Sequence, residues 1–102
     1  VRRIQRNIHT IDTELKSLTE EIQLFQEKIT NIKKKNLKLE DDKKYQTIDE
    51  IEGTNAQILE NEKIIQNTQK EIKKLEERKQ MLTASRKDAE ERLEILKKEK
   101  DN

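Results

Sequence analysis

The chain has 102 residues, of which 29% are hydrophobic and 44% are charged, and its mean hydropathy is −1.22. This composition leaves too little apolar material for a globular core, and no apolar run approaches the roughly 20 residues of a membrane span. The 23 basic residues nearly balance the 22 acidic ones, and the balance holds in each half without a basic arm or acidic tail, so the charge does not favour nucleic-acid binding.

Proline and glycine, which interrupt helices, and cysteine, which forms disulfides, are nearly absent from the sequence. There is no proline and one glycine, and the apolar residues are periodic, so the sequence predicts long helix rather than disorder. The absence of cysteine excludes a disulfide framework and cysteine-based zinc sites. Without a signal-peptide pattern, we expect a protein of the cytoplasm or nucleus that is neither secreted nor transmembrane. Because the chain begins with Val1 rather than Met, we interpret it as a segment of a longer protein.

Residues 1–39 carry an apolar stripe whose members recur at alternating steps of three and four. A 3.5-residue repeat keeps one narrow stripe of an α-helix facing a partner helix, as in coiled coils. The stripe therefore predicts a first helix with a helix-pairing seam. Its candidate pairing residues are Ile4, Ile8, Ile11, Leu15, Leu18, Ile22, Phe25, Ile29, Ile32, Asn36 and Leu39.

The phase of this stripe is lost in residues 40–57. Thr47 and Thr54 each stand three residues before a Glu or Gln, which is the spacing of an N-terminal capping box. Gly53, the single glycine, directly precedes the second threonine, and glycine tolerates the left-handed conformation that ends helices. We therefore predict a turn within residues 50–55, with Gly53 and Thr54 as its candidate residues.

Residues 58–102 carry a second heptad stripe that is weaker and offset by one residue from the first. Polar residues, including Thr68, Lys79 and Arg86, interrupt it. It predicts a second helix with its own pairing seam. The apolar candidates in this seam are Ile58, Ile65, Ile72, Leu75, Leu82, Leu93 and Leu96.

The two seams predict an all-α fold, a long heptad-repeat coiled coil that folds back as an antiparallel hairpin turning near Gly53. The alternative is one continuous helix in a two-stranded rod, either with a second copy or with a heteromeric partner. Flanking charges argue against a parallel homodimer, because Lys28 would face Lys33 across it. If the chain folds back about residue 52, each seam residue faces the one whose residue number, added to its own, gives 104. In this predicted alignment Asn36 faces Thr68.

We expect no catalytic, cofactor-binding or metal site. His9 is the only histidine, and no acid or second imidazole accompanies it at helical spacing, so it is interpreted as a surface side chain. Asp41 and Asp42 are interpreted as solvated, because a pair of helices offers no cleft that would desolvate them. The sequence thus favours a non-enzymatic protein without cofactor or small-molecule substrate, whose partners are protein helices.

The whole chain resembles the coiled-coil rods of centriolar and spindle-pole proteins, axonemal scaffolds, vesicle tethers, motor stalks and chromosome-structure ATPases. The resemblance rests on the heptads alone. It implies a structural segment that acts as a spacer, tether or oligomerisation element in a larger cytoskeletal, centriolar, axonemal or chromosome-associated assembly. The alternative function is a regulated binding module, in which one seam pairs with a helix of a different protein.

Overall fold

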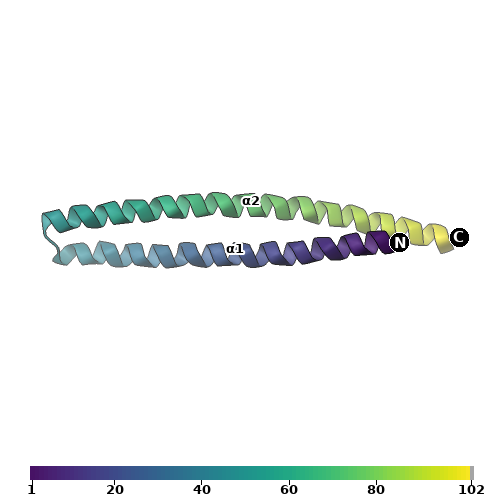
Figure 1. The fold of residues 1–102 in the computed structure, drawn as a ribbon, viewed down its shortest axis with the longest axis horizontal. Coiled ribbons are helices and arrows are strands. Elements are labelled where there is room, and N and C mark those ends of the chain that lie inside the picture. Colours follow the sequence, from purple (N-terminus) through teal and green to yellow (C-terminus); the bar gives the residue numbers. More distant parts are fainter. Residues whose placement is uncertain (102) are drawn as a thin grey trace. The chain divides into compact units, whose positions relative to one another are not determined.

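The structure, a computed structural model, describes residues 1–101 and the side chains of residues 1–100. Helix α1 (Arg2–Asp42) has 41 residues and helix α2 (Ile48–Asp101) has 54, and between them lies the short 3-10 helix η1 (Lys43–Tyr45) (Figure 1). The predicted all-α fold class is confirmed.

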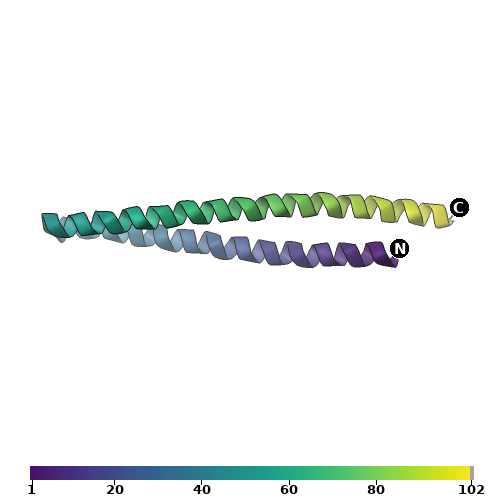
Figure 2. The same ribbon diagram turned by 45° about the horizontal axis from the view of Figure 1, so that its top comes forward.

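The contacts divide the chain into two units. We call Gln23–Lys73, which contains the turn, the turn unit, and Val1–Ile22 together with Lys74–Asn102 the terminal unit. Within each unit a segment of α1 lies beside a segment of α2 that runs in the opposite direction, as both views show (Figures 1 and 2). Each unit is therefore a helix pair built from segments distant in the sequence.

Helix α1 ends in a run of acidic residues followed by two lysines. Lys43 reaches back to Glu40 with its Nζ 3.0 Å from the carboxylate, and Lys44 reaches Asp41 at 2.8 Å. Negative charge at a helix C-terminus is unfavourable because the last carbonyls already carry partial negative charge, and the two lysines offset it. Gln46 then adopts an extended conformation, with φ −107° and ψ 154°, which ends the helical path.

Helix α2 begins with a capping box at Thr47. The backbone N–H of Glu50 donates to Thr47 Oγ1 over 3.3 Å, and the same hydroxyl donates to the Glu50 carboxylate over 3.2 Å. These bonds give a partner to one of the N–H groups that the first helical turn leaves free. Asp49 and Glu50 also place negative charge in the first turn, where the helix dipole favours it.

The turn predicted at residues 50–55 is wrong in position. Gly53 and Thr54 lie inside α2, no glycine has a positive φ, and the chain reverses at Lys43–Thr47. The capping box predicted at Thr47 is formed, whereas the second candidate, at Thr54, lies within a helix that has already begun. The first helix consequently runs past residue 39 to Asp42, and the second begins ten residues earlier than residue 58.

The buried side chains line the face where α1 and α2 meet in each unit. In the terminal unit Ile11, Leu18 and Leu82 form a buried cluster against which Leu15 and Leu75 pack. In the turn unit the buried apolar residues are Ile29, Ile58 and Ile65. Burial of an isoleucine or leucine side chain contributes about 1.5–3 kcal/mol, so this narrow face is the main source of stability.

Candidate functional site

The candidate functional site is the helix-pairing seam, the eighteen residues that the two stripes single out. Most of them lie between the helices, and Leu96, 38% exposed near the end of α2, is the exception. The buried members are Ile11, Leu18, Ile22, Ile29, Ile58, Ile65 and Leu82. The half-buried members are Ile4, Ile8, Leu15, Phe25, Ile32, Asn36, Leu39, Ile72, Leu75 and Leu93.

A pair of asparagines marks how the helices of the turn unit are aligned in this structure. Asn61 Nδ2 donates to Asn36 Oδ1 over 2.8 Å, from a partly buried position. The residue numbers of this facing pair sum to 97, whereas the predicted alignment, in which Asn36 faces Thr68, has a sum of 104. The predicted alignment is therefore wrong by seven residues, or one heptad. The physical reason is the start of α2: Thr47 caps the helix seven residues before Thr54 would have done so.

Two buried threonines in the turn unit have their hydroxyls satisfied. Thr68 Oγ1 donates to the carbonyl of Ile64 over 2.7 Å, and Thr54 Oγ1 donates to Gln46 Oε1 over the same distance. Among the described residues, every buried side-chain nitrogen and oxygen has a hydrogen-bond partner. Thr54, predicted from the sequence as a turn residue, is instead a buried seam residue; it stands one heptad before Asn61 and so continues the second stripe.

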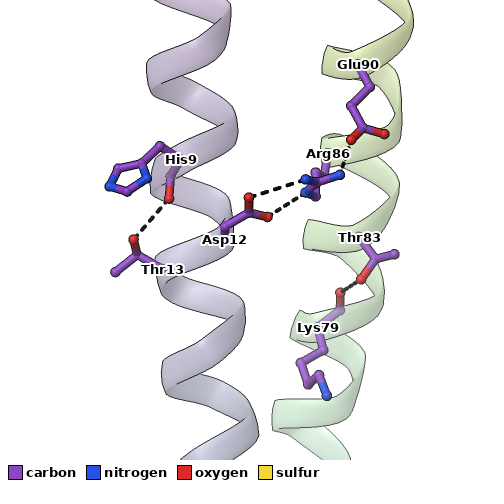
Figure 3. Close-up of polar contacts among 7 residues, drawn as sticks. All are labelled: His9, Asp12, Thr13, Lys79, Thr83, Arg86 and Glu90. Carbon is purple, nitrogen blue, oxygen red and sulfur yellow. Dashed lines mark hydrogen bonds and ion pairs between the residues drawn. The ribbon is translucent and has the colours of Figure 1, made fainter.

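In the terminal unit, Arg86 of α2 connects the helices (Figure 3). Its Nε and Nη2 donate to the two carboxylate oxygens of Asp12, the latter over 3.3 Å, and its Nη1 donates to Glu90 on the next turn of α2. The hydrogen bond from Arg86 holds the pKa of the Asp12 carboxyl below its usual value. The bonds to Asp12 and Glu90 raise the pKa of the Arg86 guanidinium. An arginine at a seam position thus keeps its charge paired at the edge of the seam.

A second ion pair spans the terminal unit. Arg78 of α2 lies 3.1 Å from the Glu14 carboxylate of α1. Both side chains are about half exposed, so the pair contributes at most about 1 kcal/mol, and its value lies more in alignment than in stability. His9, the histidine considered above, is exposed, and Figure 3 shows its ring pointing away from α2.

Replacing Asp12 by Asn should remove an acid-sensitive part of the stability. A carboxyl with a lowered folded pKa stabilises the protein above its unfolded value of 3.8, and this contribution is lost as the pH falls through the lower folded value. At about pH 7 we expect the wild type to have a higher melting temperature than Asp12→Asn. This difference in melting temperature should disappear below pH 3.8. Melting followed by circular dichroism measures it. In an Arg86→Gln background the difference should be absent, and a difference persisting in strong acid would contradict the assignment.

The chain is an all-α protein of two long helices. Comparisons with protein-family models, curated proteins and solved structures find no match to it. Among the described residues, neither helix contains a stretch long and apolar enough to cross a membrane. Within the same residues, no three acidic, histidine or cysteine side chains gather in a group that could hold a metal ion.

Proposed function

We propose that the chain is a non-enzymatic antiparallel coiled-coil hairpin that acts as a spacer, tether or oligomerisation element in a larger cytoskeletal, centriolar or spindle, axonemal or chromosome-associated assembly. One observation carries this proposal. In the terminal unit the buried side chains of Ile11 and Leu18 on α1 cluster with Leu82 on α2 of the same chain, and in the turn unit Asn36 of α1 bonds to Asn61 of α2. The seam is thus occupied within the chain, which suits a structural part rather than one that waits for a partner helix.

The polar contacts support the same role. Asn36 with Asn61 in the turn unit, and Arg86 with Asp12 in the terminal unit, join α1 to α2 by bonds that a parallel or displaced pairing would break. Polar seam residues of this kind specify alignment at some expense of stability. Both ends of the described chain lie in the terminal unit, so sequences joined to either end would leave the hairpin from that unit.

A groove in the turn unit favours the second candidate, a regulated module that binds a helix of a different protein. Its volume is about 520 Å³, and Ile58, Ile65 and the 71% exposed Leu37 line it, with Lys33 and Glu62 also along it. An apolar groove rimmed by charge is the kind of surface that receives an amphipathic helix. This binding would add a helix to the hairpin rather than replace one of its own.

The dependence of melting on protein concentration tests the proposed function. A hairpin folds within one chain, so its melting temperature, followed by circular dichroism, should stay constant over about a hundredfold range of concentration. Helices that pair between chains should instead melt at higher temperature as the concentration rises. Mass determination by light scattering on the same samples should give a single chain. A concentration-dependent transition of a larger particle would overturn the hairpin and favour a rod whose helices pair between chains.

A further inference from the structure

Gly53 has no role in the observed arrangement of the turn unit. It lies in the second turn of α2, its φ is not positive, and apart from its chain neighbours and the adjacent helix backbone no atom lies within 4 Å of the position that a Cβ would take. Glycine in a helix is less favourable than alanine because it loses more backbone freedom. Neither packing nor backbone conformation explains why glycine stands here.

Two threonines offer alternative starts for α2, separated by one heptad. Thr47 forms the observed capping box with Glu50. Thr54 stands at the same spacing from Gln57, directly after Gly53, but in this arrangement its hydroxyl donates to Gln46. A glycine followed by a threonine is the sequence of one helix ending and the next beginning. The chain thus carries a second complete turn signal seven residues after the one it uses.

Two layers of the seam keep their apolar or polar character under a displacement of the same size. In the observed alignment, defined by Asn36 and Asn61, the facing numbers sum to 97, which places Leu39 opposite Ile58. Advancing α2 by seven residues places Leu39 opposite Ile65, so the layer stays apolar. The same step places Asn36 opposite Thr68, so the polar layer stays polar. Because the heptad repeats, seven residues is the smallest displacement that keeps each stripe facing the other.

We propose that the turn unit has a second alignment, one heptad from the observed one, and that the helix pair slides between the two. In this second alignment α1 continues through residues 43–49, Gly53 closes the turn and Thr54 caps α2. The step moves one helix by about 10 Å along the other, at 1.5 Å per residue. Because each helix is continuous, it breaks the bonds of Asn36 with Asn61 and of Arg86 with Asp12. The inference rests on the proposed antiparallel hairpin and adds a movement to it.

The displacement would change what the turn presents to a partner. In the observed alignment Tyr45 and Ile48 are 87% and 86% exposed beside the turn. In the second alignment both residues belong to the extended α1, and residues 50–54 form the turn. A protein that binds Tyr45 and Ile48 would therefore favour the observed alignment, and its binding would be coupled to the position of the helices.

Paired cysteines test the two alignments, since the natural chain has none. Leu39→Cys with Ile58→Cys bridges the observed alignment, and Leu39→Cys with Ile65→Cys bridges the second. Leu39→Cys with Ile72→Cys, displaced by two heptads, is the control. Each variant is equilibrated in a thiol–disulfide buffer, and intramolecular bridges are identified by mass spectrometry after digestion. We expect both of the first two bridges and not the third.

The outcomes separate this inference from the hairpin itself. A bridge between residues 39 and 58 without one between 39 and 65 would overturn the sliding and leave the hairpin intact. Absence of all three intramolecular bridges would overturn both. Equal bridging of 39 with 65 and with 72 would indicate loose pairing rather than two defined alignments, and would also overturn the proposal.

Substitutions at the two turn signals should move the equilibrium in opposite directions. Gly53→Ala favours a continuous α2, so it should lower the ratio of the 39–65 bridge to the 39–58 bridge, measured in the separate cysteine variants, by about fivefold. Thr47→Ala removes the cap of the observed alignment and should raise that ratio by a similar factor. Asn67→Ala is the matched control, because residue 67 is helical in both alignments, and it should leave the ratio unchanged. A ratio insensitive to both turn substitutions would overturn the proposal.

Discussion

Replacing Ile29 by asparagine is expected to lower the free energy of unfolding by about 3 kcal/mol. Ile29 is 8% exposed in the turn unit, and the alignment of Asn36 with Asn61 places it opposite Thr68. The Thr68 hydroxyl already donates to the carbonyl of Ile64, so an introduced carboxamide would lose water without gaining a hydrogen-bond donor from across the seam. Asparagine is accommodated at position 36 because a second asparagine faces it there.

Leu37→Asn is the matched control for this change. It replaces an apolar residue of the same helix by the same polar one, but at a position that is 71% exposed. Its effect on stability should stay within about 0.5 kcal/mol. Chemical denaturation followed by circular dichroism gives both values. Similar losses at positions 29 and 37 would contradict the assignment of the seam as the source of stability.

The bond between Asn36 and Asn61 should behave as a unit in a double-mutant cycle. Asn36→Leu alone leaves the Asn61 carboxamide in the seam without its partner and should cost about 1–3 kcal/mol. Adding Asn61→Leu replaces both amides by apolar groups, and the double variant should be at least as stable as the wild type. The difference between the double variant and the sum of the single ones gives the coupling free energy.

Asn31→Leu controls for the general effect of introducing leucine into α1, because Asn31 is exposed. This variant should change the free energy of unfolding by less than about 0.5 kcal/mol. If the effects of Asn36→Leu and Asn61→Leu are simply additive, the two side chains do not depend on each other, and the asparagine pair does not set the alignment of the turn unit.

Most of the helical structure could be predicted from the sequence because it depends on composition and period. The run of isoleucines from Ile4 to Ile32 marks one face of α1, and structure and sequence agree that this face is turned inward. The place of the turn could not be predicted in the same way. Either threonine would contribute about 1 kcal/mol as a cap, and a glycine inside a helix costs about as much, so the local preferences differ by only about 1 kcal/mol, in favour of a turn near Gly53.

Longer contacts decide between these turns. Starting α2 at Ile48 adds nearly two helical turns, which buries Thr54, half-buries Ile51 and lets the Thr54 hydroxyl bond to Gln46. Thr54 and Ile51 stand one heptad before Asn61 and Ile58, so the period is compatible with their burial, but it does not show at which residue the helix begins. The bond between Arg86 and Asp12 depends on the alignment that they help to set. A stripe with a seven-residue period fixes which face of a helix is buried, but leaves the alignment along the axis open by multiples of seven.

Tyr45 is the single tyrosine of a chain without tryptophan, and it stands 87% exposed in η1. Ultraviolet emission excited at wavelengths that phenylalanine does not absorb therefore originates at one point, beside the reversal of the chain. Because the ring is already in water in the folded state, unfolding by a denaturant at constant temperature should change this emission little, even while the ellipticity collapses. A molecule that covers the turn should shield the ring from a dissolved quencher such as acrylamide. The native protein thus contains its own label for events at the turn, which needs neither a dye nor a substitution.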